Sequence, residues 1–258
     1  FVGDQDFSLH RYSQFGQLEI PIRKNNSGPI KIRKPKFIND QLWIENDGAL
    51  ARFIDGKAEY FQTGESVVAS FKDKLIMGTK SGAFIIDESD LDKISFDNPE
   101  SILIKDLLNP VFEIPVLNME NTNNNVVFGT AIGAYFFDGS VSSSNVLPKA
   151  KVLDIDVFED NLAITYEDIG TYLCTPSDTF LLYQSDPVSG IASCADISAD
   201  FICVGTIKGA YCFSNEDYSR LDIHYLVNTD IRDIEFFQEE LLLSTELGLY
   251  RIHQENIK

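Results

Sequence analysis

The sequence predicts an all-β fold, a β-propeller of four-stranded antiparallel blades, on three observations. One short motif recurs along the whole chain, and its clearest copy is residues 75–87, LIMGTKSGAFIID. Successive copies are about 40 residues apart, which is the length of a propeller blade. The residues on both sides of the turn are apolar at consecutive positions, as in strands that are covered on both faces. Together these observations favour blades stacked against one another over an open sheet.

Each copy of the motif has the pattern of a β-hairpin with a tight turn. In residues 75–87 two apolar runs flank the segment 79–82, and a glycine at its end can adopt the positive φ that a type I turn followed by a bulge requires. A single hairpin is marginally stable in water, so the prediction rests on the repetition. The turn positions are Gly82, Gly133, Gly209 and Gly248 in the clear copies, Gly48 and Gly170 in weaker copies, and Phe7 in the weakest.

Candidates for the first and fourth strand flank several of the hairpins. The expected inner strands are residues 66–71, 152–158, 191–197 and 231–237, and the expected outer strands are residues 18–22, 58–62, 180–184 and 222–227. Residues 99–108, PESILIKDLL, fit a short helix or another strand. Seven copies predict seven blades, and six is the alternative if residues 18–22 complete the last blade. We expect one propeller domain spanning residues 1–258, excised from a longer chain.

Composition limits the class of partner. The chain has 258 residues, is 44% apolar and carries a formal net charge of −19. Nucleic acids and anionic membranes attract clustered positive charge, so neither is the expected partner. No apolar run approaches the roughly 20 residues that a membrane-spanning helix needs, so no membrane insertion is expected. We expect a cytoplasmic protein, with a periplasmic or extracellular location as the alternative if a signal peptide has been removed.

The four cysteines all fall in expected strands, and no C-x-x-C pair is present. With the turn at residues 206–209, Cys203 and Cys212 lie opposite each other across a hairpin, where a disulfide is feasible but geometrically demanding. The favoured interpretation for these two residues, and for Cys174 and Cys194, is buried reduced thiols that act as small apolar side chains. Reduced cysteines favour a reducing compartment.

Two copies of the motif carry a resemblance to known families. Residues 41–61, QLWIENDGALARFIDGKAEYF, resemble the repeat of the two-component regulator propellers, whose pattern is L-W-I-G-T-x-x-G-L-x-R-F. The copies with G-T-x-x-G followed by an apolar residue and tyrosine, such as residues 205–211, are similar to the citron-homology and WD40-like propellers of trafficking and signalling proteins. The resemblance implies a propeller whose function is binding, in most such proteins of other proteins and in some of small ligands.

No catalytic or cofactor-binding motif is present. His10, His224 and His253 occupy unlike positions in different copies, so they do not form a rim cluster. Metalloprotease, Walker, nucleophile-elbow and dinucleotide motifs are absent. The acidic run at residues 87–92, DESDLD, lacks the glycine and the final glutamate of an EF-hand loop and is interpreted as a solvated loop. The sequence therefore predicts no enzyme, no metal and no cofactor.

Two groups of charged residues stand out. Carboxylates recur at matching places on expected inner strands, at Asp154, Asp156, Asp233 and Glu235, and we expect them to line a solvated channel, with a cation site as the alternative. A basic patch lies between the first two copies, and either docks an acidic peptide or lipid head group or forms an exposed strand and loop. This patch comprises Arg23, Lys24, Lys31, Arg33, Lys34 and Lys36.

The pair of residues before each turn glycine is the candidate binding site. Large aliphatic residues have no local reason to occupy a hairpin tip, and contiguous apolar surface is commonly interfacial. The alternative is that each tip packs against a loop of the neighbouring blade. The expected partner-binding residues are Ile132, Ile169, Ile207 and Leu247, together with Lys80 and Lys208.

The sequence thus predicts a non-catalytic protein-protein interaction scaffold, a subunit of a larger complex that displays hairpin tips on one face of a propeller. Two alternatives stay open. A ligand-sensing propeller domain of a signalling receptor predicts an extracytoplasmic location and a small molecule that protects against unfolding. A propeller hydrolase or lyase predicts a tightly bound metal or a cluster of acid and base side chains on one rim.

Overall fold

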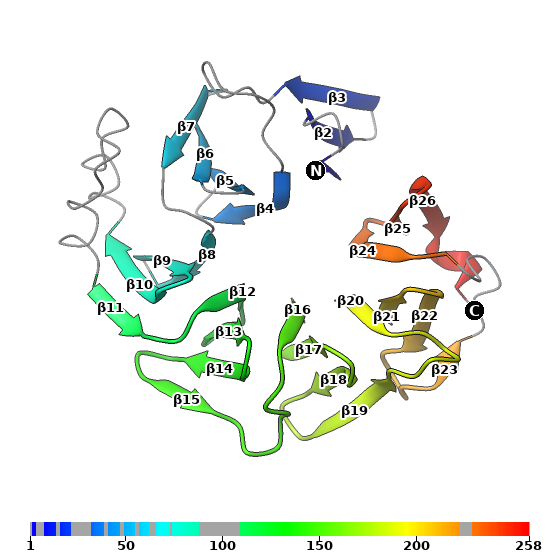
Figure 1. Ribbon diagram of the computed structural model, residues 1–258. Coiled ribbons are helices and arrows are strands. Elements are labelled where there is room, and N and C mark those ends of the chain that lie inside the picture. Colours follow the sequence, from blue (N-terminus) through cyan, green and yellow to red (C-terminus); the bar gives the residue numbers. More distant parts are fainter. Residues whose placement is uncertain are drawn as a thin grey trace. The chain divides into compact units, whose positions relative to one another are not determined.

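Seven antiparallel sheets follow one another along the chain in the computed structural model (Figure 1). The structure describes residues 2–3, 8–13, 16–21, 32–38, 41–46, 49–54, 57–61, 66–72, 74–87, 109–221 and 229–257. These residues form strands, turns and one short 3-10 helix, and among them there is no helix that could cross a membrane. The chain divides into two compact units, residues 1–117 and 118–258, which are described separately below.

Unit 1 contains three sheets. In each of them, strands that are neighbours in sequence pair antiparallel. The first sheet is β1 (Val2–Gly3), β2 (Ser8–Ser13) and β3 (Gly16–Pro21); the second is β4 (Ile32–Ile38), β5 (Gln41–Asn46), β6 (Ala49–Ile54) and β7 (Lys57–Phe61); the third is β8 (Ser66–Phe71), β9 (Lys74–Thr79), β10 (Gly82–Asp87) and β11 (Asn109–Phe112).

Unit 2 contains four sheets. The first strand of the first sheet, β12, begins two residues before the unit boundary. The first three sheets have four strands and the last has three. They are β12 (Val116–Asn121), β13 (Val126–Thr130), β14 (Gly133–Phe137) and β15 (Val141–Ser143); β16 (Val152–Phe158), β17 (Asn161–Tyr166), β18 (Gly170–Cys174) and β19 (Thr179–Gln184); β20 (Ala192–Ile197), β21 (Phe201–Thr206), β22 (Gly209–Ser214) and β23 (Arg220–Leu221); and β24 (Ile231–Phe237), β25 (Glu240–Thr245) and β26 (Gly248–His253), followed by η1 (Gln254–Asn256).

The repeated motif forms the hairpin between the second and third strand of a sheet, as predicted. The turn glycines have positive φ, for example +132° at Gly133 and +133° at Gly209. The threonine before the turn closes it: the buried Thr130 hydroxyl donates to the Gly133 carbonyl at 2.7 Å and accepts from the Ile132 N–H at 3.1 Å. The sequence Thr-x-x-Gly therefore specifies both the turn conformation and its hydrogen bonds.

Most of the predicted flanking strands are present. The inner strands β8, β16 and β24 have the predicted bounds, and β20 begins one residue later than expected. The outer strand predicted at residues 18–22 is β3, which pairs with β2 in the first sheet. The six-blade alternative placed this segment in the last sheet, so that alternative is wrong. The segments predicted at 99–108 and 222–227 lie outside the described residues.

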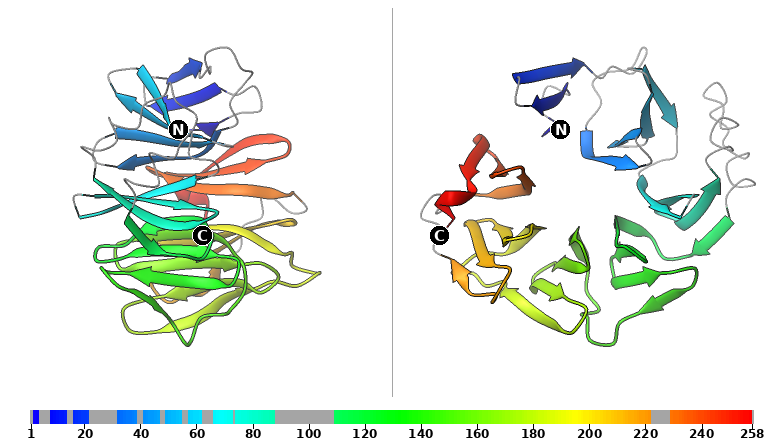
Figure 2. Two further views of the ribbon diagram at one scale, coloured as in Figure 1. Left: turned by 60° about the vertical axis from the view of Figure 1, so that its left-hand side comes forward. Right: turned by 180° about the vertical axis from the view of Figure 1, so that it is seen from behind.

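The first strands of the sheets in unit 2 lie side by side and run in one direction. Figures 1 and 2 show β12, β16, β20 and β24 along the inner side of the fan of sheets in this unit. Asp154 of β16 accepts from the Ala195 N–H of β20 at 3.1 Å, and Asp156, two residues later, accepts from the Ile197 N–H at 2.9 Å. Because the contact advances by two residues on both strands, β16 and β20 are aligned in parallel.

Apolar side chains fill the space between neighbouring sheets of unit 2. One cluster joins Val127 and Ala134 of the β12–β15 sheet to Ile155 and Ile164 of the next sheet. Another joins the last two sheets through residues such as Leu243. Consecutive residues of the central strands β17 and β21 are buried because the sheets that contain them lie between two other sheets of this unit, which is why these strands lack a polar face.

Candidate functional site

The topology brings several loops of unit 2 to one edge of the sheets. Since β16 and β20 run in parallel, both begin at the same edge, and the hairpin between the second and third strand of each sheet returns to it. Asp196 and Ser193 of β20 bond the backbone of β24 at Phe236 and Ile231, which extends the alignment to the last sheet. We call this the loop edge; it comprises residues 131–132, 144–151, 167–169, 185–191, 207–208 and 246–247.

The loop edge carries the most exposed large aliphatic side chains of the described residues. Their exposed fractions are 51% at Ile132, 64% at Val146, 86% at Val188, 48% at Ile207 and 72% at Leu247. The other exposed large hydrophobic residues in the described part of the chain lie between 36% and 38%. Apolar side chains this exposed on several successive loops of one edge form a candidate protein-binding surface.

The loop between β19 and β20 holds Val188 in a fixed conformation. The Asp186 carboxylate accepts from the backbone N–H groups of Val188 at 2.6 Å and Ser189 at 2.9 Å. Asp186 and Gly190 exchange two backbone hydrogen bonds, at 3.2 and 2.9 Å, which close the base of the loop. Asp186 therefore forms hydrogen bonds with the backbone of three residues of its own loop, and the Val188 side chain lies in solvent.

Neighbouring strands brace the same loop. The hydroxyl groups of Tyr183 and Tyr211 donate to loop carbonyl groups at 3.0 and 2.6 Å. The Lys208 ammonium donates to two loop carbonyl groups, at 3.3 Å in the case of Val188. Because Lys208 directly follows Ile207, these bonds bring the Val188 loop beside the β21–β22 hairpin tip.

The predicted tip residues do not behave alike. Ile132, Ile207 and Leu247 are exposed, whereas Ile169 is half-buried and packs against a cluster that includes Leu147 of the preceding connection. The packing of Ile169 is that of the alternative, in which a tip lies against a neighbouring loop, and the role of Ile169 in an apolar binding arc stays a prediction.

The two predicted lysines have different settings. Lys208 braces the Val188 loop instead of extending into solvent. Lys80 lies exposed at the turn between β9 and β10, in unit 1.

Val146 and Val188 were missed because they lie in the connections between sheets and not in the repeated hairpin. Residues 186–190 read Asp-Pro-Val-Ser-Gly, in which turn-forming residues surround one apolar residue. That pattern is a signal for a displayed side chain, since the turn residues leave the valine with no local packing role.

The basic patch is described only in part. Arg33, Lys34 and Lys36 belong to β4. Arg23, Lys24 and Lys31 lie outside the described residues.

Inner-strand carboxylates have structural roles in unit 2. Asp154 is buried, with 5% of its surface exposed, and its bond to β20 corrects the expectation that it lines a solvated channel. Asp156 forms a side-chain hydrogen bond with the buried Asp196. Burial raises the pKa of both carboxyl groups, and the contact with Asp156 raises that of Asp196 further. Both carboxyl groups therefore keep a proton to higher pH than an exposed aspartate does.

Glu235 on β24 completes this acidic row. The pKa of Glu235 is raised to about 7 because the protein atoms around its carboxyl group disfavour the charged form and because Asp156 and Asp233 are negative neighbours. In the described part of the chain, no group of three or more His, Cys, Asp or Glu side chains is arranged to hold a metal ion.

Three cysteines of unit 2 share one apolar cluster, and two of them are bonded. The structure joins Cys203 and Cys212 in a disulfide across the β21–β22 hairpin, with Cα atoms 4.1 Å apart. The expectation of reduced thiols is corrected for this pair. Cys194, buried in the same cluster, and the half-buried Cys174 are free.

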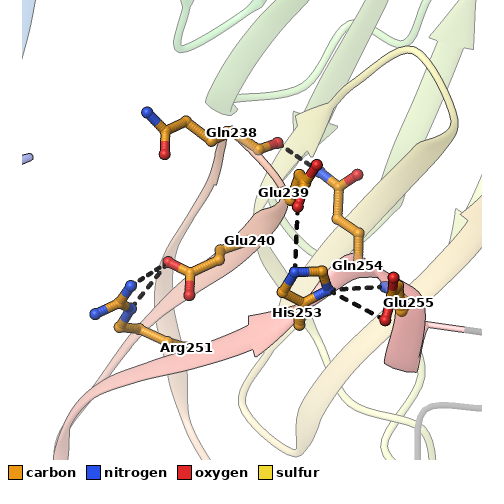
Figure 3. Close-up of polar contacts among 7 residues, drawn as sticks. All are labelled: Gln238, Glu239, Glu240, Arg251, His253, Gln254 and Glu255. Carbon is orange, nitrogen blue, oxygen red and sulfur yellow. Dashed lines mark hydrogen bonds and ion pairs between the residues drawn. The ribbon is translucent and has the colours of Figure 1, made fainter. Parts of the chain in front are cut away.

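Ionic contacts surround the end of β26. His253 lies 3.3 Å from the Glu239 carboxylate and 4.0 Å from Glu255, and Arg251 pairs with Glu240 at 2.5 Å (Figure 3). The Glu239 and Glu255 side chains are each 83% exposed. This end of the last sheet is therefore an acidic surface.

The chain shares its fold with solved structures of low sequence identity. The computationally designed Ika8 protein matches with a TM-score of 0.66 and 12% identity over 97% of this chain and 79% of its own. The extracellular domain of the putative one component system BT4673 from B. thetaiotaomicron matches with a TM-score of 0.65 and 16% identity over 95% of this chain. BBS1N, in a complex with ARL6DN, matches with a TM-score of 0.64 and 12% identity over 97% of this chain and 86% of its own.

These likenesses establish the fold class. Together with the four-stranded antiparallel sheets, they identify an all-β fold of the β-propeller type. The chain spans 36% of the BT4673 structure, so it corresponds to a part of that protein's extracellular domain. No protein-family model and no curated protein matches the sequence.

Proposed function

We propose that this chain is a non-catalytic binding module that docks a protein partner on the loop edge of unit 2. One observation supports this most strongly: the five most exposed large aliphatic side chains of the described residues all lie on that edge. Complete burial of one aliphatic side chain stabilises a complex by roughly 1.5–3 kcal/mol. A partner that covers two or three of these side chains therefore obtains a substantial part of the binding free energy of a stable interface.

The construction of the Val188 loop supports the proposal independently. Its hydrogen bonds to Asp186, Tyr211 and Lys208 fix the loop before any partner arrives. A rigid loop loses little conformational entropy on binding, so more of the interaction energy appears as affinity.

Partner capture from the source cell tests this function with two matched double variants. Val188→Asp with Leu247→Asp places two charges on the loop edge, at positions 86% and 72% exposed, so folding is preserved. Asn124→Asp with Ala199→Asp places the same two charges in exposed turns at the opposite edge. We expect the first variant to lose at least tenfold in affinity, about 1.4 kcal/mol or more, and the second to bind as the wild type does.

Full partner binding by the folded Val188→Asp, Leu247→Asp protein would contradict the proposal. Circular dichroism of both variants shows that a loss of binding is not a loss of fold.

A second candidate, a ligand-sensing extracytoplasmic propeller, draws on two observations. The Cys203–Cys212 disulfide is a bond that persists mainly in oxidising compartments. The BT4673 structure with the same fold is an extracellular domain of a putative one component system. This candidate predicts that a small molecule raises the melting temperature and that the Val188→Asp, Leu247→Asp protein responds to it as the wild type does.

A further inference from the structure

The hairpin that braces the Val188 loop is closed by a disulfide. Cys203 of β21 and Cys212 of β22 lie opposite each other, and three residue pairs separate their disulfide from the turn. The matching pair of the β13–β14 hairpin is Val127 and Phe136, so no covalent bond closes that hairpin at this position. The two hairpins therefore share their turn and register and differ in this bond.

The side chains by which this hairpin contacts the Val188 loop lie between the two cysteines in sequence. The Lys208 ammonium group donates to the Val188 carbonyl group at 3.3 Å. The Tyr211 hydroxyl group donates to the Ser189 carbonyl group at 2.6 Å, and Tyr211 directly precedes the second cysteine. Movement of the hairpin therefore displaces the groups that fix the loop.

Breaking the disulfide loosens the hairpin for two reasons. Cys203 and Cys212 are 0% exposed and share an apolar cluster with Leu243 of the last sheet, so two separate thiol groups must find room in a closely packed interior. The two cysteines are nine positions apart in sequence. A cross-link over so short a loop disfavours opening of the loop by up to roughly a hundredfold in the equilibrium constant, and reduction removes this restraint.

We propose that reduction of the Cys203–Cys212 disulfide weakens partner binding at the loop edge, so that thiol redox state regulates the docking surface; this inference rests on the proposed function of that edge. In the oxidised chain the hairpin holds the Val188 loop in one conformation. In the reduced chain the contacts of Lys208 and Tyr211 are broken in a fraction of the molecules, and binding must first order the loop. Loss of one such hydrogen bond corresponds to roughly two- to tenfold weaker binding.

The reductant is a dithiol. One of its thiolates attacks a sulfur atom of the disulfide, a mixed disulfide forms, and the other cysteine leaves as a thiolate that takes up a proton. The second thiolate of the reductant then attacks the mixed disulfide and releases the remaining cysteine. Two electrons and two protons pass to the protein in total, and the dithiol becomes a disulfide. Because both cysteines are buried, the reductant reaches them when the hairpin opens.

Partner binding and reduction oppose each other by the same factor. A partner that binds the oxidised chain about fivefold more tightly makes the disulfide about fivefold harder to reduce at saturation. For this two-electron couple the factor corresponds to a reduction potential that is lower by about 21 mV. Equilibration with mixtures of reduced and oxidised dithiothreitol measures this shift, and an unchanged potential at saturating partner would contradict the proposal.

Hydrogen exchange followed by NMR tests the link between the disulfide and the loop without any partner. The N–H groups of Lys208 and Ile132 donate to the threonine hydroxyl group of their own turn at 3.0 and 3.1 Å, so they form a matched pair. We expect dithiothreitol to speed exchange at least tenfold at Lys208 and at Gly190 of the Val188 loop, and to leave Ile132 unchanged. Equal exchange in both redox states, or an equal acceleration at Ile132, would overturn the proposal.

Isothermal titration with the protein captured from the source cell tests the regulation itself. We expect the oxidised chain to bind this protein about fivefold more tightly than the reduced chain does. The control, Cys203→Ala with Cys212→Ala, has no bond to reduce and is expected to bind equally with and without dithiothreitol.

The outcomes separate this inference from the proposed function. If the captured protein fails to bind the Val188→Asp, Leu247→Asp variant but binds both redox states of the unmodified chain equally, the proposed function stands and the redox inference is overturned. Full binding by that variant would overturn both. An equal effect of dithiothreitol on the double alanine variant would overturn the redox inference, because the effect would then arise from another group.

Discussion

Replacing turn glycines by alanine separates the cost of a backbone conformation from the cost of displacing a strand. Gly170 and Gly248 have nearly the same positive φ, so Gly170→Ala and Gly248→Ala introduce the same local strain, about 1–3 kcal/mol. Only Gly170→Ala also drives a methyl group against the backbone of Tyr183, with 1.9 Å between the new Cβ and the carbonyl oxygen.

The additional cost of Gly170→Ala comes from the displacement of β19, whose backbone the new methyl group would contact. Relief of the contact opens the start of the β18–β19 ladder, including the hydrogen bond from the Ser185 N–H to the Ile169 carbonyl at 2.9 Å. Two or three backbone hydrogen bonds at about 0.5–1.5 kcal/mol each add roughly 2–3 kcal/mol. We expect Gly170→Ala to lower the free energy of unfolding by that much more than Gly248→Ala does.

Urea unfolding followed by circular dichroism measures both losses. Equal losses for the two variants would refute the reasoning, because they would mean either that β19 yields without cost or that a strand covers Gly248 in solution. A larger loss at Gly248 would refute it more strongly.

Two further predictions concern stability. Thr130→Val removes both hydrogen bonds of a fully buried hydroxyl group, and we expect it to lower the free energy of unfolding in urea by about 1–3 kcal/mol. The matched variant Thr79→Val removes the same two contacts of a half-buried hydroxyl group and is expected to lower that free energy by less. Equal losses in the two variants would contradict this prediction. The folded chain raises the pKa of Glu235 from 4.5 to about 7, so its carboxyl group favours folding when protonated and this contribution is lost as the pH rises through about 7. We expect the free energy of unfolding to fall between about pH 4.5 and pH 7 and the fall to be smaller in Glu235→Gln, whereas an identical fall in the variant would contradict the assignment.

Strand positions could be predicted because they depend on local sequence. The apolar runs at residues 66–71 and 152–158 end at turn residues, and the structure begins and ends β8 and β16 at the predicted positions. The register of the β21–β22 hairpin follows from its turn glycine, so the pairing of Cys203 with Cys212 was foreseen even though the bond between them was not favoured.

Side-chain environments at the loop edge could not be predicted in the same way, because they depend on the neighbouring sheet. The copy at Gly170 has an extra turn residue, Asp168 adopts a φ of 61°, and Ile169 packs near Leu147. Asp196 was missed because its significance comes from the contact with Asp156 on the adjacent sheet, which no single repeat contains.

The central claim is that the loop edge of unit 2 contacts a partner protein, and site-specific photo-crosslinking in the source cell tests it most directly. A photoreactive amino acid replaces Val188 in one protein and Asn124, in an exposed turn at the opposite edge, in another. The account predicts that one partner protein crosslinks at position 188 and does not crosslink at position 124. Crosslinking of the same partner at position 124 and not at position 188 would contradict it.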